Sequence, residues 1–165
     1  MSRPSTLNGK SCQPMVTQNA HDKVAGVSLL VISHSLFRGI KERVLATHGE
    51  SCGFLAGQLD GQEAKVEQAF FVTNLAGSPD YFVISPKEHW QAEAMAEQNG
   101  RELIGVFHSH QRDPQPSAKD RENMRYYPLI WLILGETEAR QLEQMVSLAF
   151  KPAREGPRPV AIRIE

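Results

Sequence analysis

The sequence predicts an α/β domain of the α+β kind, in which helices pack against a mixed β-sheet. Three observations lead to this class. The chain has 165 residues, a length that suits one domain with a sizeable hydrophobic core. Apolar runs of strand length alternate with amphipathic segments that have helical spacing. The run YPLIWLILG at residues 127–135 is almost wholly apolar, which is typical of a central strand.

We expect residues 1–26 to be a loosely ordered leader and residues 27–165 to form the folded domain. The leader is polar, with scattered Pro, Gly, Ser and Asn and no sustained apolar period. It lacks the continuous apolar core of a signal peptide, and the chain nowhere approaches the ~18 apolar residues of a membrane span. The expected location is therefore cytoplasmic, without a membrane partner.

Four elements open the predicted domain, and apolar spacing and helix or strand breakers set their bounds. They are a β-rich strand at residues 27–32, an amphipathic helix at residues 33–49, and two strands at residues 51–59 and 65–74. Gly49 ends the helix, since glycine is a common helix stop. Between the two later strands, the Asp60-Gly61 pair favours a tight hairpin turn.

A capped helix is predicted at residues 85–100. Ser85 and Glu88 have the spacing of a capping box, Pro86 takes the first helical position, and Gly100 ends the helix. The remaining apolar runs predict strands at residues 81–85, 102–110, 127–135, 143–151 and 158–165, although residues 137–149 could equally begin as a helix.

Charge and cysteine content exclude several function classes. The 18 basic and 19 acidic residues give a net charge of −1, without the Lys/Arg stripe of a nucleic-acid binder, so no nucleic-acid partner is expected. The two cysteines, Cys12 and Cys52, indicate neither a disulfide framework nor a CxxC zinc or redox pair.

The stretch GVFHSHQRDPQPSAKD at residues 105–120 carries the side chains best suited to chemistry. On a strand, His108 and His110 project from the same face, so two imidazoles can bind one ion. Asp120 is the candidate third ligand, because two prolines in the loop break regular structure and let the chain turn back. Zinc commonly takes three such ligands and a water molecule in catalytic sites.

An interpretation without a metal fits the same residues. Ser117 and Asp120, as S-x-x-D, have the spacing of a capping box at a helix start. An H-x-H pair at a strand end is commonly two partly exposed histidines. Ser109, between them, points to the opposite face and suits strand packing or a hydrogen bond. Spacing alone leaves both interpretations open.

A further motif, Glu50-Ser51-Cys52-Gly53, follows the first helix. With His108-Ser109-His110 and Ser117-Ala118-Lys119-Asp120, in that order, it resembles the JAMM (MPN-plus, JAB) metalloprotease family, whose pattern is E-x-C/M-G, then H-S/T-H, then S-x-x-D. The segment VTNLAGSPDYFVISPKEHW also looks like the family's bacterial members, so the resemblance covers most of the chain from about residue 28. The loop QRDPQP is one residue shorter than the family pattern.

The resemblance implies a three-layer sandwich, in which a mixed, curved β-sheet is flanked by helices in the cytidine-deaminase-like JAB1/MPN fold. It implies one Zn²⁺ per chain, with His108, His110 and Asp120 as metal ligands. Glu50 is then the catalytic general base. Ser117 is expected to donate a hydrogen bond to the oxyanion and to cap the helix that carries Asp120. No other cofactor is expected.

The function implied is that of a zinc metallopeptidase or isopeptidase. It would hydrolyse the bond after the C-terminal Gly-Gly of a ubiquitin-like protein or sulfur carrier, which is the expected partner; the oligomeric state stays open, a homodimer included. The alternative is a non-catalytic MPN scaffold that binds partners. Such relatives have lost ligands, whereas this chain retains the three ligands and the glutamate. The HExxH motif of helical zincins and the H-x-E and P-C-x-x-C motifs of zinc deaminases are absent.

Overall fold

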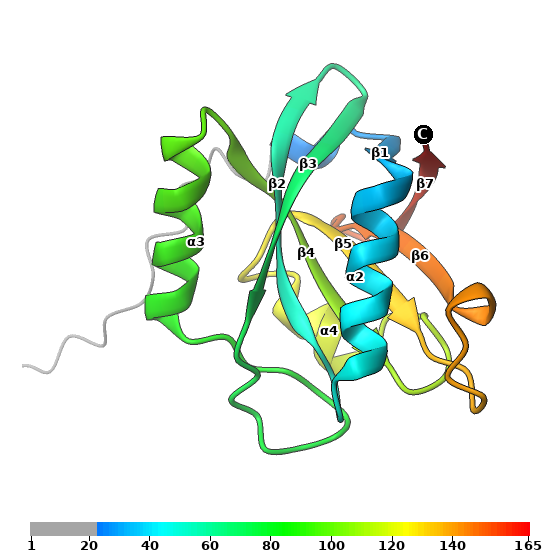
Figure 1. Cartoon of the computed structure of the whole chain (residues 1–165). Coiled ribbons are helices and arrows are strands. Elements are labelled where there is room, and N and C mark those ends of the chain that lie inside the picture. Colours follow the sequence, from blue (N-terminus) through cyan, green and yellow to red (C-terminus); the bar gives the residue numbers. More distant parts are fainter. Residues whose placement is uncertain (1–22) are drawn as a thin grey trace, which may run out of the picture.

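Seven strands form one mixed sheet in the computed structural model, which describes residues 23–165. The strand order is β1-β3-β2-β4-β5-β6-β7, and β1 pairs with both β3 and β7, so the sheet curves round and closes (Figure 1). The pairs β1–β3, β1–β7 and β4–β5 are parallel, and the others are antiparallel. The expected mixed, curved sheet is confirmed.

The bounds of the elements show how closely the apolar runs map onto strands and helices. In chain order the elements are β1 (Leu29–Ile32), α2 (His34–Ala46), β2 (Cys52–Asp60), β3 (Glu63–Val72), α3 (Pro86–Gln98), β4 (Glu102–His110), α4 (Ala118–Asn123), β5 (Ile130–Gly135), the 3-10 helix η1 (Leu142–Gln144), β6 (Val146–Lys151) and β7 (Arg158–Ile164).

Helices cover both faces of the sheet, which gives the expected three layers (Figure 1). One core contains Phe37, Ile40 and Val44 of α2 together with Ile130, Leu132 and Leu134 of β5. The other core contains Ala92 and Ala96 of α3 together with Trp131 and Ile133 of β5. This alternation follows from the two-residue period of a strand and explains why β5 is apolar throughout. Within residues 23–165, no helix combines the length and apolar character needed to cross a membrane.

The predicted strand at residues 81–85 is wrong. Phe82 and Ile84 are buried and Val83 between them is exposed, so burial alternates as in a strand. The segment, however, has no strand partner. Its backbone is instead held by the side chain of Asn74, which accepts from Val83 N at 3.0 Å and donates to Tyr81 O at 3.3 Å. Alternating burial alone therefore does not distinguish a strand from an anchored loop.

The predicted capping box of α3 is half right. Ser85 caps the helix by accepting from Glu88 N at 3.0 Å. The Glu88 carboxylate, however, accepts from the backbone N–H and the hydroxyl of Thr73, both at 3.1 Å. The glutamate thus ties the end of β3 to the start of α3.

The ends of the predicted domain also differ in detail. The predicted leader extends to residue 26, but residues 23–25 are helical and Val24 is buried in the core with Val27; the rest of the leader lies outside the described residues. Near the C-terminus, the helical alternative at residues 137–149 reduces to the short η1, and β6 follows it.

Gly53 on β2 gives a test of how tightly this sheet is packed. A Cβ at this position would lie 2.1 Å from the backbone oxygen of Phe70 and 2.6 Å from the Phe107 ring. Because a backbone atom cannot move aside cheaply, we expect Gly53→Ala to lower the free energy of unfolding by about 3 kcal/mol or more, measured by urea denaturation.

Gly39 on α2 is the matched control, because a Cβ there meets no atom within 4 Å. Gly39→Ala should raise the unfolding free energy by about 0.5–1 kcal/mol, as expected for a helix interior. Equal stabilities of the two variants would contradict the close approach of β2, β3 and β4 at Gly53.

Candidate metal centre

The last residues of β4 place two imidazoles side by side. His108 and His110 lie on the same face of the strand, and their Nε2 atoms are 2.9 Å apart. The His108 side chain is fully buried, and its ring packs on Phe82 and Trp131 with centroids 4.6 and 5.7 Å away. His110 is 13% exposed, so the pair is open to solvent on one side only.

Asp120 reaches these histidines from α4. Its Oδ1 lies 3.1 Å from His108 Nε2, and its Oδ2 lies 3.2 Å from His110 Nε2. The expected capping box is present: Asp120 N donates to Ser117 Oγ at 3.1 Å, and Ser117 N donates to Asp120 Oδ2 at 2.8 Å. Capping and convergence on the histidines therefore occur together rather than as alternatives.

The donor set fits a zinc ion. One ligand atom from each of His108, His110 and Asp120 lies within 4.8 Å of the other two. Atoms that share a tetrahedral zinc at roughly 2.0–2.1 Å are about 3.3 Å apart, close to the spacing here. His110 Nδ1 lies 2.8 Å from the carbonyl of Asp113, an arrangement that places the proton on Nδ1 and leaves Nε2 free to bind a metal.

The ionisation of His108 and Asp120 also suits a metal, whereas the raised pKa of His110 means that a metal must displace a proton from this imidazole. Burial lowers the pKa of His108 and so favours the neutral imidazole that a metal requires. Burial acts to raise the pKa of Asp120, but hydrogen bonds with His108 and His110 and from Ser117 N outweigh it, so this pKa falls well below its usual range. Burial lowers the pKa of His110, while its hydrogen bonds to Asp120 and Asp113 more than offset that effect.

Glu50 lies between α2 and β2, next to the three-residue cluster. Its side chain is buried, with 7% of the residue exposed, and Oε2 has no hydrogen-bond partner among the described residues. Burial raises the pKa of Glu50 to about 7; the charge of His110 opposes this shift, and those of Asp120 and Asp80 add to it. A carboxyl group with a pKa near neutrality can both take and return a proton at physiological pH.

The short loop between His110 and Ser117 closes compactly. Asp113 turns it by accepting from Gln115 N through its side chain at 3.0 Å, while its carbonyl contacts His110. The six residues QRDPQP therefore suffice to bring Asp120 back to the end of β4. Ser117, at the end of this loop, accepts one hydrogen bond through a hydroxyl that remains able to donate another.

Two residues contribute to the site in ways that the sequence motifs did not specify. Ser109 Oγ accepts from Ser51 N at 2.9 Å, and Ser109 N donates to Ser51 O at 3.0 Å, so the strand residue between the histidines holds the residue after Glu50. Asn74 Nδ2 donates to Glu50 O at 3.1 Å. The hydrogen bond of Ser109 was expected, although not its partner; Asn74 resembles an ordinary turn residue in sequence.

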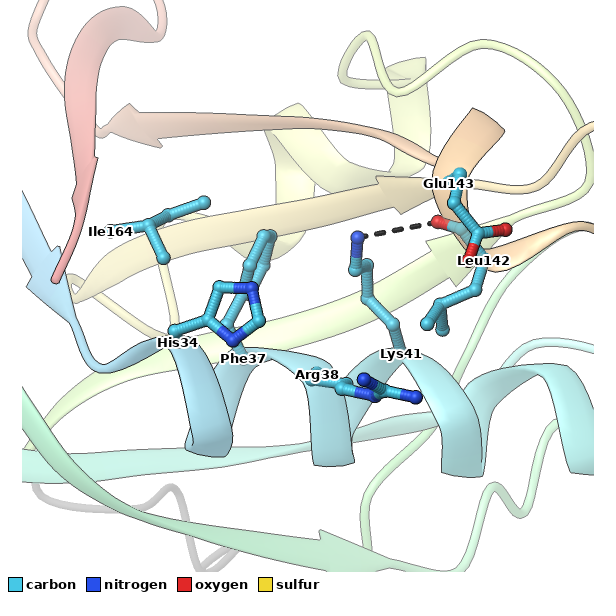
Figure 2. A pocket seen from close by; sticks show the side chains of 7 residues that line it. All are labelled: His34, Phe37, Arg38, Lys41, Leu142, Glu143 and Ile164. Atoms are coloured by element: carbon cyan, nitrogen blue, oxygen red, sulfur yellow. Dashed lines mark hydrogen bonds between the residues drawn. The ribbon is translucent and has the colours of Figure 1, made fainter.

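A pocket in another part of the fold is formed by residues outside this cluster (Figure 2). Its lining comes from α2, η1 and β7 and consists of His34, Phe37, Arg38, Lys41, Leu142, Glu143 and Ile164. Lys41 Nζ donates to the backbone oxygen of Leu142 at 3.3 Å. The pocket therefore adds no side chain to the candidate metal centre.

Comparison with known proteins identifies the family. The family model for prokaryotic homologs of the JAB domain matches residues 33–149, which include Glu50, both histidines and Asp120. The chain belongs to this family. The JAB-domain chain is 40% identical over 110 residues to the desampylase of Pyrococcus furiosus, a match that covers 66% of this chain and 76% of that protein. It is 36% identical over 86 residues to the desampylase of Haloferax volcanii, covering 51% and 60%.

Solved structures share this fold. A Desulfitobacterium hafniense protein superposes on the JAB-domain chain with a TM-score of 0.73 and 27% identity, covering 82% of this chain and 92% of that one. A Salinibacter ruber protein has a TM-score of 0.60 and 22% identity, covering 81% and 90%, and supports the fold alone. Because the chain belongs to the JAB family and is similar to two desampylases, it is a hydrolase of the JAMM type.

Proposed function

We propose that this hydrolase is a zinc-dependent isopeptidase or peptidase that cuts after the C-terminal Gly-Gly of a ubiquitin-like protein or sulfur carrier. The observation that carries the proposal is the convergence of His108, His110 and Asp120 beside a buried carboxyl, Glu50, whose pKa is about 7. The two desampylase relatives, as hydrolases of ubiquitin-like protein conjugates, support the same substrate class.

In this mechanism His108, His110 and Asp120 would hold the zinc ion. A bound zinc would supply Lewis acidity to the attacking water molecule and to the scissile carbonyl. Glu50 accepts the proton of the attacking water and delivers it to the leaving amine, which its pKa near neutrality permits in both directions. Ser117 Oγ donates to the oxygen on which negative charge develops, while it continues to accept from Asp120 N.

The preference for Gly-Gly has a steric basis in this proposal. A hydrolase that must bring a peptide carbonyl close to a buried cluster selects against side chains next to the scissile bond. Glycine has no side chain, so a Gly-Gly tail can lie in an extended form where other residues would clash.

The decisive experiment combines metal analysis with cleavage. The purified protein should contain about one zinc per chain and should release the extension from a ubiquitin-like carrier lengthened beyond Gly-Gly. The matched control substrate replaces the first glycine of that pair by valine, and its cleavage should be at least about tenfold slower. A protein that neither binds zinc nor cuts the carrier would instead be a non-catalytic, partner-binding member of the family.

A further inference from the structure

Asn74, the second residue after β3, uses its whole side-chain amide in hydrogen bonds to the backbone. Its Oδ1 accepts from Ala76 N at 2.9 Å and from Val83 N at 3.0 Å. Its Nδ2 donates to Tyr81 O at 3.3 Å and to Glu50 O at 3.1 Å. One amide therefore joins both ends of the loop at residues 75–83 to the residue that carries the buried carboxyl.

The Glu50 side chain has little to hold it in place by itself. Its Oε2 atom is buried and has no hydrogen-bond partner among the described residues. The peptide group that follows it is anchored instead: Asn74 Nδ2 donates to the Glu50 carbonyl, and the N–H of Ser51 donates to Ser109 Oγ. The direction of the carboxyl group thus depends on bonds made to neighbouring backbone atoms.

We propose that Asn74 is a positioning residue for Glu50 and couples the general base to the loop at residues 75–83. The inference rests on the proposed function, in which Glu50 transfers the proton. An asparagine that only closed a turn would need its Oδ1 bonds to Ala76 and Val83. The bond to Glu50, 24 residues earlier in the chain, adds nothing to that turn.

The loop that Asn74 anchors presents apolar side chains to the outside. Leu75 is 55% exposed and Val83 is 43% exposed, and their backbones are joined by a bond from Leu75 N to Val83 O at 2.9 Å. Next to Asn74, Thr73 is fixed to Glu88 of α3. The loop and the backbone of Glu50 are therefore both bonded to the Asn74 side chain. A shift of either one relative to Asn74 would break at least one of its four hydrogen bonds.

Two substitutions separate the two sides of the Asn74 amide. Asn74→Asp keeps acceptors for Ala76 N and Val83 N but loses the Nδ2 donor to both Glu50 O and Tyr81 O, whereas Asn74→Ala loses all four bonds. We expect both variants to lower kcat by about 10–100-fold, as for a misplaced catalytic group. Only Asn74→Ala should also raise KM, by about threefold or more, because Asn74→Asp keeps the two Oδ1 bonds that hold the loop.

A double variant tests whether Asn74 acts through Glu50. In a Glu50→Gln background, Asn74→Ala should reduce the remaining kcat by less than twofold, because the group that Asn74 positions is already inactive. Full multiplication of the two effects would mean that Asn74 acts independently of Glu50 and would overturn the proposal.

Amide hydrogen exchange provides a readout without any activity. The N–H groups of Ala76 and Val83 should stay protected in Asn74→Asp and exchange at least tenfold faster in Asn74→Ala. The N–H of Ser51 should exchange faster in both variants, because the Glu50–Ser51 peptide group keeps its bond to Ser109 but has lost its anchor to Asn74. Unchanged protection at Ser51 in both variants would overturn the positioning role.

Asn99→Asp is the matched control for the change of charge and shape. Asn99 Nδ2 also donates to a backbone carbonyl, that of Met95 at 2.9 Å, but at the end of α3. This variant should keep the wild-type kcat, KM and Ser51 exchange.

The outcomes separate the two proposals. If the wild-type protein cuts no Gly-Gly carrier, the proposed function fails, and the exchange rate of the Ser51 N–H still decides the role of Asn74. If the wild type is active and both Asn74 variants keep their kcat, the positioning inference alone fails.

Discussion

Replacement of Glu50 by Gln will lower kcat on a Gly-Gly carrier by roughly 10²–10⁴-fold, the range typical of losing a general base. Glutamine has nearly the same shape and can occupy the same buried position, but it cannot accept the proton of the attacking water. Because Glu50 is not among the three clustered ligand candidates, the zinc content should stay near that of the wild type. The measurements are steady-state kinetics and metal analysis on the same preparations.

The same substitution will stabilise the metal-free protein at alkaline pH. The pKa of Glu50 rises from 4.5 to about 7 on folding, chiefly through burial. Between these values the folded state binds a proton that the unfolded state releases, so the unfolding free energy falls as pH rises through this window. Glutamine has no such cost, so Glu50→Gln should exceed the wild type by up to about 3 kcal/mol at pH 8 and by little below pH 4.5.

Urea denaturation of chelator-treated protein at pH 4.5 and pH 8 measures this difference. Glu42→Gln is the matched control, because that glutamate is 54% exposed in its ion pair with Arg38. Exposed pairs contribute about 0–1 kcal/mol, so the control should change little with pH. If the Glu50→Gln protein is less stable than the wild type at pH 8, burial does not raise the pKa of the Glu50 carboxyl group as stated.

Replacement of Asp120 by Ala will remove both zinc and activity. The substitution takes away one of three converging ligands and leaves His108 and His110 alone. Loss of residues that merely orient a ligand typically costs 10–100-fold in metal affinity, so loss of the ligand itself should cost at least about 100-fold. Zinc binding measured by competition with a chelator, together with kcat/KM, gives the result.

Two further variants separate metal binding from capping. Asp120→Asn keeps an oxygen that can accept from Ser117 N but loses the charge, so it should retain α4 and still bind zinc poorly. Glu122→Ala removes an exposed carboxylate of the same helix that pairs with Lys119, and it should keep wild-type zinc content. Unchanged zinc affinity in both Asp120 variants would exclude this residue as a ligand.

Local patterns in the sequence predicted most elements because one physical signal dominates each of them. The strand at residues 102–110 coincides with β4, since its apolar run ends in the two histidines. The capping box at Ser117 and Asp120 was also predicted correctly, because both partners lie within one turn of helix. The same motif at Ser85 gave only half of its bonds, since Thr73 competes for the Glu88 carboxylate.

Features set by distant pairings could not be obtained in this way. The closure of the sheet depends on parallel pairing of β1 with β3 and β7, whose registers no local pattern encodes. Residues 81–85 were predicted to form a strand because YFVIS is an apolar run of strand length. The side chain of Asn74 holds this segment through hydrogen bonds to backbone atoms. Every residue has these backbone atoms, so the sequence does not show which of them Asn74 will bind.

Closure of the sheet has a consequence for how the protein behaves in solution. Within residues 23–165, each of the seven strands has a neighbour on both sides, although β1 covers only residues 63–66 of β3 and β7 covers only residues 149–151 of β6. Exposed strand edges are the usual templates for intermolecular pairing and aggregation. Closure of the sheet therefore shortens the strand edge that is open to pairing with another molecule to parts of single strands.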